Sequence, residues 1–142
     1  MKSSLIPRMA LLAVLSAASA LAHADVVVVM SAKSDVASLS QAQVSQIFLA
    51  KSSSLPGGGA ATPIDQDEGA DVRNEFYSKV TGKDAAQMKA YWSQLMFTGK
   101  AQRPKKVAGD DAVKKAVAAS PGSIGYISAG AVDGSVKVVL KP

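Results

Sequence analysis

The sequence predicts a small α/β domain in which a mainly parallel β-sheet is flanked by helices. Val26–Met30 is an unbroken apolar run of mostly β-branched residues, which is typical of a strand covered on both faces. Helical apolar patterns and further short apolar runs follow in the order strand, helix, strand, three helices and further strands. The chain has no cysteine, so packing alone must hold this fold.

The first 24 residues have the pattern of a cleavable export signal. A start with two basic residues is followed by an apolar run over residues 9–21 and by Ala-His-Ala at 22–24, which fits the small-x-small rule of signal peptidase. A membrane anchor is the alternative, but the run is shorter than the ~18–20 residues that span a bilayer. We expect cleavage after Ala24, a periplasmic location, no membrane-spanning segment, and one domain over residues 25–142.

The first half of this domain contains a polar loop, a helix and a glycine-rich segment. Ser31–Asp35 follows the first strand at its carboxyl end, where open α/β sheets usually bind ligands. Ser40 and Gln43 form a predicted capping box that starts a helix. Residues 51–59 are rich in Ser, Pro and Gly and predict a surface loop. A phosphate-cradling loop is the alternative, but the Gly-Lys-Ser/Thr ending of such loops is absent from these residues.

The middle of the domain predicts a strand and two helices. Ala60–Ile64 is the strand, and a helix runs from Asp71 to a stop at Gly82. A third helix opens at Asp84 and ends at Gly99. Its apolar stripe, expected to form core rather than a ligand-stacking face, consists of Met88, Tyr91, Trp92, Leu95 and Met96.

One more helix and two strands complete the predicted order. Asp110 or Asp111 is expected to cap the fourth helix, which Pro121-Gly122 ends. The short apolar runs Ile124–Ile127 and Val136–Leu140 are the remaining strands.

Four acidic residues crowd around the start of the second predicted helix, namely Asp65, Asp67, Glu68 and Asp71. A metal site or a paired-carboxylate catalytic site is one interpretation. Capping and a favourable interaction with the helix dipole explain the same cluster, and the spacing of an EF-hand is absent from it. We therefore expect no metal site here.

The side chains expected after export do not favour catalysis. The single histidine, His23, lies in the predicted signal, so imidazole and thiol chemistry are both missing from residues 25–142. A carboxylate-only hydrolase would need a second carboxylate cluster, which the sequence does not show. We expect a protein that is not an enzyme and needs no cofactor.

The charge of the exported chain is only mildly basic. Loss of Lys2 and Arg8 lowers the formal net charge from +5 to +3. The basic cluster, formed by Lys100, Arg103, Lys105 and Lys106, lacks the neighbouring aromatic residues of a nucleic-acid site. We expect a solvated loop there, and no nucleic-acid partner.

Three ordered motifs carry a resemblance to a known family. They are the Leu-Ser helix start within Ser38–Lys51, the Pro-Ile-Asp segment within Pro63–Phe76, and Pro121–Tyr126. In this order the chain resembles the phosphate ABC transporter substrate-binding proteins, above all their short single-domain members, which also carry Tyr-Trp and Phe-Thr-Gly-Lys segments like Tyr91-Trp92 and Phe97–Lys100. The resemblance implies a type II periplasmic-binding-protein-like domain.

The resemblance also implies how a ligand would be held. Full-length members are two-lobed and bind phosphate through hydroxyls, main-chain amides at helix starts and an arginine. Where the family has Arg-x-x-Gly-Ser-Gly-Thr, this chain has Gln66–Val72, and only Gly69 carries over. The N-terminal portion that supplies the family's first phosphate loop has no counterpart.

Our leading hypothesis is a solute-binding-type protein that binds phosphate or another small oxyanion, or a polar solute, without chemistry. The candidate ligand-binding residues, at a strand end and a helix start, are Ser31, Ser34, Gly69, Ala70 and Arg73. For Arg73 an ion pair with Asp71 or Glu75 is the alternative role.

A second hypothesis is a non-transporting interaction module of the cell envelope, built on a shortened lobe. Such a module would bind another envelope protein or self-associate, whereas a transport component would contact an ABC permease. An exposed apolar patch would favour the module. A closed polar pocket that holds Ser31 and the Gly69 amide would favour solute binding.

Overall fold

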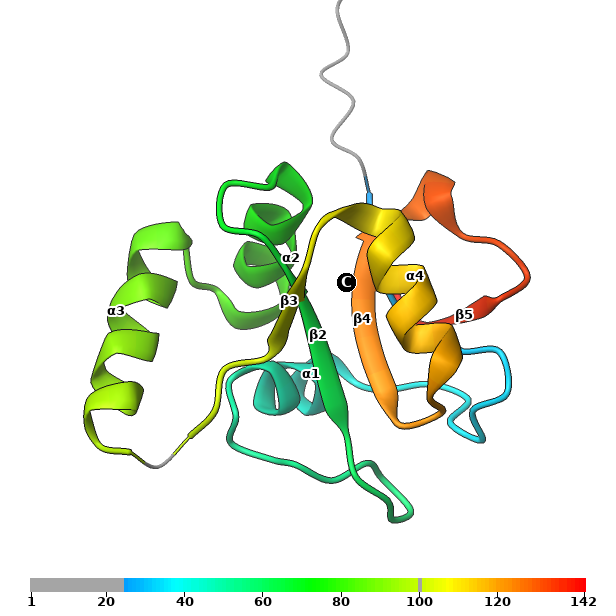
Figure 1. The fold of residues 1–142 in the computed structure, drawn as a ribbon, viewed down its shortest axis with the longest axis horizontal. Helices are drawn as coiled ribbons and strands as arrows, with labels where there is room; N and C mark the ends of the chain where they lie inside the picture. The colour runs from blue at the N-terminus through cyan, green and yellow to red at the C-terminus, as the bar shows by residue number, and fades with distance from the viewer. Residues whose placement is uncertain (1–24, 100) are drawn as a thin grey trace, which may run out of the picture.

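The computed structural model describes residues 25–99 and 101–142 (Figure 1). The predicted export signal and Lys100 lie outside the described residues. The elements are β1 (Val26–Ser31), α1 (Gln41–Phe48), β2 (Thr62–Gln66), α2 (Asp71–Thr81), α3 (Ala85–Phe97), β3 (Lys105–Val107), α4 (Gly109–Ala119), β4 (Ser123–Ser128), the 3-10 turn η1 (Ala129–Ala131) and β5 (Val136–Leu140). None of the described helices is long and apolar enough to cross a membrane.

The five strands form one sheet in the order β3-β2-β4-β1-β5. β2 pairs in parallel with β3 and β4, whereas β1 pairs antiparallel with β4 and β5. Four strands therefore share one direction and only β1 runs against them, so the predicted fold class, a mainly parallel sheet flanked by helices, is confirmed.

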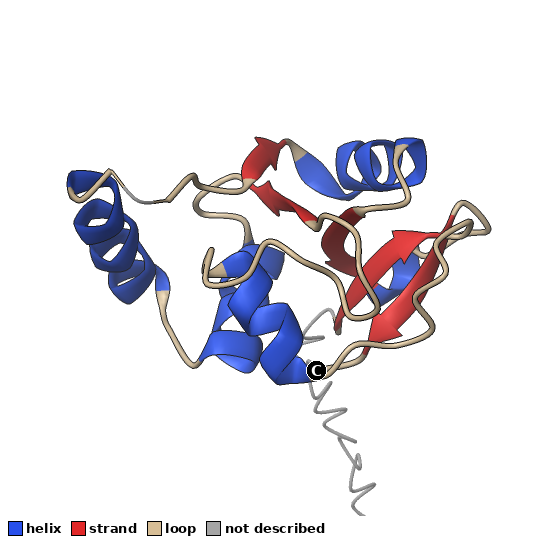
Figure 2. Cartoon of the chain, turned by 90° about the horizontal axis from the view of Figure 1, so that it is seen from below, coloured by secondary structure: helices blue, strands red, loops and turns tan. Residues whose placement is uncertain are grey.

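The direction of β1 corrects one step of the prediction. All six residues of β1 are buried, as its apolar run indicated, yet this is the antiparallel strand. An unbroken apolar run reports burial on both faces, and burial is independent of strand direction. β1 is buried because it lies between β4 and β5 in the sheet and helices cover both of its faces (Figures 1 and 2).

Alternate residues of the strands feed two apolar clusters. Val28 and Met30 pack on one face with residues of α1, α2 and α3. Val27 and Val29 pack on the other face with α4. At Gly125 a Cβ atom would lie 2.5 Å from Val113 Cγ1, so the lack of a side chain allows α4 to sit directly on β4.

Two predicted helix starts are confirmed in detail. The Ser40 Oγ accepts a hydrogen bond from the Gln43 amide at 3.1 Å, and the Asp84 carboxylate accepts one from the Gln87 amide at 2.8 Å. Each partner glutamine closes the capping box by accepting from the cap residue's amide. Gly82 ends α2 in the left-handed conformation, as predicted.

The start of α4 and the bounds of β2 differ from the predictions. Neither Asp110 nor Asp111 caps α4, because both lie in its first turn and Ala108 is the N-cap residue. β2 runs two residues further than expected, so Asp65 and Gln66 are buried strand residues and not part of a helix cap.

The stripe on α3 is only partly core. Met88 and Trp92 are buried and Tyr91 and Leu95 are partly buried, but Met96 is 56% exposed. α3 stands out from the body of the domain (Figure 1), so its last turn extends past the apolar surface that covers its start.

Candidate functional site

The five predicted ligand-binding residues form two groups that lie at opposite ends of the strands. Met30, next to Ser31, faces Ile124, which also pairs with Pro63 near the start of β2. Ser31 and Ser34 are therefore at the amino-terminal edge of the parallel strands. Gly69, Ala70 and Arg73 follow β2 and are at the carboxyl-terminal edge. The structure does not bring the two groups together, because β1 runs in the opposite direction to β2 and β4.

The two serines shape the turn after β1. The Ser31 Oγ accepts from the Lys33 amide and the Ser34 Oγ from the Val36 amide, both at 3.2 Å. The carbonyl of Ser34 also accepts a hydrogen bond from the Lys137 ammonium. Both serines are buried, and their hydroxyls accept hydrogen bonds from backbone amides two residues further along the chain.

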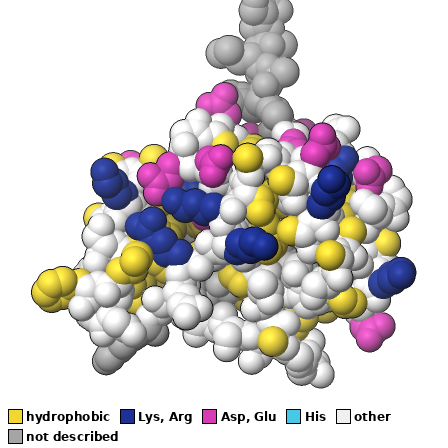
Figure 3. Space-filling model, viewed as in Figure 1, with side chains coloured by type: hydrophobic (Ala, Val, Ile, Leu, Met, Phe, Trp, Pro, Cys, Tyr) yellow, Lys and Arg dark blue, Asp and Glu magenta, His cyan; other side chains and the backbone are white. Residues whose placement is uncertain are grey.

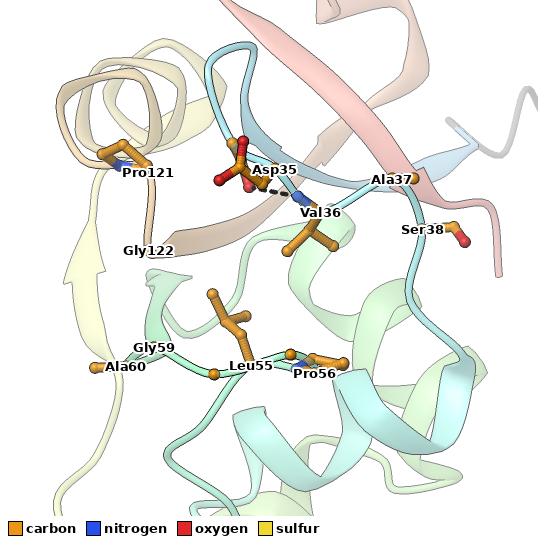
Figure 4. A pocket seen from close by; sticks show the side chains of 13 residues that line it. Asp35, Val36, Ala37, Ser38, Leu55, Pro56, Gly59, Ala60, Pro121 and Gly122 are labelled. Carbon is orange, nitrogen blue, oxygen red and sulfur yellow. Dashed lines mark hydrogen bonds between the residues drawn. The ribbon is translucent and has the colours of Figure 1, made fainter.

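Ser34 lines an open pocket of about 700 Å³ (Figure 4). One wall is the segment 34–38, and the other is the glycine-rich loop 55–60. The side chains of Val36 and Leu55 point toward each other across the gap in Figure 4. Asp35 is the one charged residue in its lining, so this pocket offers an anion no positive charge from the described side chains.

At the other edge, the start of α2 has no side-chain cap. Gly69 has φ +91° and Ala70 is the N-cap residue, in an extended conformation. The Ala70 amide donates to the Asp67 carbonyl at 3.2 Å. Among the described residues, the amides of Asp71 and Val72 have no backbone acceptor, so they are open to a ligand or water.

Arg73, one turn into α2, makes a buried ion pair with Asp65 of β2. Their relative exposures are 4% and 2%, and the Arg73 Nε lies 3.5 Å from the Asp65 Oδ1. The guanidinium also lies over the Tyr77 ring at 4.9 Å. Neither predicted ion-pair partner is used, since Glu75 instead pairs with Lys79 at 3.0 Å. In the folded chain Asp65 lies within ion-pair distance of Arg73, whereas Asp71 and Glu75, the neighbours of Arg73 on α2, form no ion pair with it.

Two tyrosines complete the surroundings of Asp65. The Tyr77 hydroxyl donates to the Asp65 Oδ2 at 2.8 Å, and the Tyr126 hydroxyl donates to the Oδ1. The Gln66 amide donates to the Oδ1 at 2.8 Å. Burial and then the Asp65 charge raise the pKa of both tyrosines well above the ordinary value, so both hydroxyls stay protonated donors.

A small pocket of about 200 Å³ lies between the starts of α2 and α3. Gly69 and Arg73 line it from α2 and its entry loop, and Ala85, Ala86 and Lys89 line it from the first turns of α3. Trp92 and Glu68 complete the lining. The Arg73 Nε is buried and, within the described chain, has no hydrogen-bond partner. The start of α2, the capped start of α3 and two basic side chains thus line one small cavity.

Glu68 is the carboxylate at the rim of this pocket. Its oxygen lies 3.1 Å from the Lys106 ammonium and 3.6 Å from the Arg103 guanidinium. The Lys106 hydrogen bond and charge hold the pKa of Glu68 below its usual value. The two cations therefore compensate the Glu68 charge.

Acidic side chains surround this edge more widely. The carboxylates after β2 and at the start of α4 all lie here, and Figure 3 shows Asp and Glu side chains gathered along the upper part of this face. Asp110 is tied to the fold, since it accepts from the Gln66 side chain at 2.9 Å and from the Ser128 amide at 3.3 Å. Within the described ranges, no group of three or more acidic, histidine or cysteine side chains is placed to hold a metal ion.

The sequence patterns did not indicate the contacts of Asp65 with Tyr77 and Tyr126, or the position of Lys89 in the lining of the small pocket. Tyr126 is 61 residues from Asp65 in the chain, so no local spacing signals their contact. The available signal is that Asp65 directly follows the predicted strand 60–64, whereas its closeness to Asp67 and Glu68 favours a helix start instead.

Known proteins share this fold over part of their length. No family model matches the chain, and no curated protein was found to match it. A solved ABC-type phosphate transport receptor from Vibrio cholerae is similar, with a TM-score of 0.65, 17% identity, and coverage of 81% of this chain and 45% of that chain. The PstS protein of Borrelia burgdorferi gives a TM-score of 0.62 at 12% identity and covers 81% and 46%.

A third solved structure, from Clostridium perfringens, is described as a phosphate ABC transporter substrate-binding protein with bound phosphate. Its TM-score is 0.64 at 21% identity, with coverage of 81% of this chain and 44% of that chain. The chain thus spans less than half the length of these proteins. It shares the fold of part of these solved phosphate-binding proteins, so the resemblance expected from its motifs is confirmed at the level of the fold.

Proposed function

We propose that this protein is a periplasmic, non-catalytic solute-binding-type protein that holds phosphate or another small oxyanion at the start of α2. The observation that carries the proposal is the 200 Å³ pocket between two helix starts, where Arg73 and Lys89 both line the cavity. Uncapped amides and cations are the groups that bind oxyanions in proteins.

The two cations contribute differently. Arg73 is more than nine-tenths buried and its Nε faces Asp65 at 3.5 Å, so its positive charge is largely compensated and it contributes mainly a fixed polar wall to the pocket. Lys89 is exposed on α3, and in the described chain it has no carboxylate within ion-pair distance. Lys89 therefore supplies the uncompensated positive charge of the site.

The neighbouring carboxylates set an upper limit on affinity. Asp71 lies in the first turn of α2 and repels an anion. Glu68 lines the pocket and repels it less, because Lys106 and Arg103 compensate much of its charge. We therefore expect weaker binding than a site made of hydroxyls and arginine would give. Delivery of the solute to an ABC permease belongs to the same proposal and rests on the fold resemblance alone.

Titration calorimetry of residues 25–142, freed of carried-over phosphate, tests the site with phosphate and sulfate. We expect saturable heat, and a loss in affinity of about threefold or more in Lys89→Gln, because one exposed ammonium contact is removed. Lys115→Gln, an equal change of charge on α4, is the matched control and keeps the affinity. No saturable heat, or equal losses in both variants, would contradict the proposal.

The second candidate function is an envelope interaction module, and the exposed end of α3 favours it. Phe97 is 94% exposed and Met96 is 56% exposed. Large apolar side chains that project together from a surface are typical of contact sites. This chain matches less than half of each of those longer phosphate-binding proteins. A second copy of this chain is therefore the partner that we would test first.

Sedimentation of residues 25–142 over a range of concentrations tests this candidate. We expect concentration-dependent association that the double substitution Met96→Ser with Phe97→Ser abolishes. Val132→Ser changes another exposed apolar residue, 37% exposed, and should leave association intact. A monomer at every concentration would contradict self-association.

A further inference from the structure

A second basic pocket lies at the amino-terminal edge of the sheet, away from the start of α2. It has a volume of about 550 Å³ and lies between the end of α1, the start of β2 and the segment that leads into β3. Its polar lining residues are Lys51, Ser52, Ser53, Thr62, Gln102, Arg103 and Lys105. None of the described residues that line it is acidic.

The positive charge of this pocket is largely uncompensated. Lys51 and Lys105 are exposed, and no described carboxylate forms an ion pair with either. Arg103 has one carboxylate near it, Glu68 at 3.6 Å, and shares it with Lys106. Figure 3 shows Lys and Arg side chains gathered over β3 and beside it. Two lysines without an acidic partner, together with an arginine that shares one, create a local potential that attracts anions.

The negative end of α1 does not cancel this charge. The carbonyls of its last turn already accept hydrogen bonds from the amides of residues 49–52, at 2.9 to 3.2 Å. The Leu49 carbonyl accepts one from the Tyr91 hydroxyl at 2.5 Å. Because these carbonyls are occupied, the partial negative charge of the helix end is reduced at the pocket.

The size and lining of the pocket define the ligand. The volume is well above that of the pocket at α2 and within the range of small-molecule sites. Lysine ammonium groups and hydroxyls suit phosphate oxygens as point contacts. We infer that this pocket binds a small oligophosphate, an anion with two or more phosphate groups that contact Lys51 and Lys105 together, while Arg103 adds positive charge to the lining.

Inorganic tripolyphosphate is the probe, and its binding to ¹⁵N-labelled residues 25–142 is followed by NMR. An ionic strength of ~0.15 M screens the long-range attraction between the probe and the basic protein. We expect saturable shifts for amides within 50–53 and 101–105 and near Thr62. Orthophosphate, with a single phosphate group, should bind this pocket more weakly, and citrate tests whether carboxylates can replace phosphates.

Matched variants distinguish binding at this pocket from a general effect of the protein's positive charge. Lys51→Gln with Lys105→Gln should weaken tripolyphosphate binding about tenfold, because two ammonium contacts are lost. Lys33→Gln with Lys115→Gln removes the same charge elsewhere and should have little effect. Equal losses in the two double variants, or no saturable shifts at millimolar probe, would overturn the inference.

The inference is independent of the proposed oxyanion site at α2. Lys89→Gln should leave tripolyphosphate affinity unchanged, and Lys51→Gln with Lys105→Gln should leave orthophosphate heat at the α2 site unchanged. Tripolyphosphate shifts confined to residues 69–73 and 85–89 would overturn the inference and still support the other site.

Discussion

The ion pair between Asp65 and Arg73 is the most consequential contact at the scale of single residues. Both groups are almost fully buried, and two tyrosine hydroxyls and a backbone amide satisfy the carboxylate. A buried pair of this kind contributes little net stability as a whole, but loss of one partner leaves a buried charge without compensation.

Asp65→Asn should therefore destabilise the protein strongly, by ~3–5 kcal/mol in the free energy of unfolding. Glu75→Gln, which breaks the half-exposed pair with Lys79, should cost less than ~1 kcal/mol. Urea unfolding of both variants measures the difference.

The double variant Asp65→Asn with Arg73→Met provides the check on this explanation. It removes both charges, so it should be more stable than Asp65→Asn alone. A double variant less stable than the single one would show that the loss comes from packing or hydrogen bonds and not from the unpaired charge.

At the scale of elements, α2 differs from α1 and α3 in having no side-chain cap. Ser40 and Asp84 cap α1 and α3, whereas Ala70 offers no oxygen to the first amides of α2. The proposed oxyanion site would use these uncapped amides as donors, so a side-chain cap that stabilises α2 would compete with binding at this position.

Substitution of Ala70 tests that competition. Ala70→Ser and Ala70→Asp should each raise the free energy of unfolding by ~1 kcal/mol, because either side chain caps α2. Ala70→Asp should also lower phosphate affinity in calorimetry, since its carboxylate takes the amides and repels the anion, whereas Ala70→Ser should lower it less. Equal phosphate affinity in both variants would argue against a site at this helix start.

The contact of α4 with β4 depends on Gly125. A methyl group there would meet Val113 at 2.5 Å and Val117 at 3.1 Å, so Gly125→Ala should destabilise the protein by ~1–3 kcal/mol through overpacking. Gly130→Ala, at a glycine with open space around it, is the control and should change the melting temperature little. Equal melting temperatures in the two variants would contradict close packing of α4 on β4.

At the scale of the whole molecule, the buried tyrosines link stability to alkaline pH. The folded-state pKa of Tyr77 and Tyr126 is raised by burial and then by Asp65, while the unfolded chain ionises its tyrosines near pH ~10. Above that pH the unfolded state binds fewer protons than the folded state, so stability is full below about pH 10 and falls as pH rises further.

Thermal melts from pH ~8 to ~11 test this linkage. Tyr77→Phe should flatten the fall at high pH, because the substituted ring cannot ionise in the unfolded state. Tyr91→Phe, at a tyrosine that is less buried, should change the slope less. A slope that Tyr77→Phe leaves unaltered would contradict the assignment.

Much of the fold was predictable because its signals are local. The capping boxes at Ser40 and Asp84, the stop at Gly82 and the buried run of β1 each depend on residues within one or two turns of each other. The strand β3 was not predicted, because Lys105 and Lys106 are exposed edge-strand residues whose pairing with β2 is decided by the partner strand.

The candidate site was predictable only in part, for the same reason. The sequence by itself determined the α/β class, the positions of four helices, and the resemblance of the ordered motifs to phosphate-binding proteins, whereas only the structure shows that α2 has no side-chain cap. The tertiary structure decided that β1 runs antiparallel, which separates Ser31 and Ser34 from Gly69. It also decided that Arg73 pairs with Asp65 and that Lys89 joins the pocket at α2. Strand direction and contacts between distant residues depend on how whole elements pack, and no local pattern of side chains records that packing.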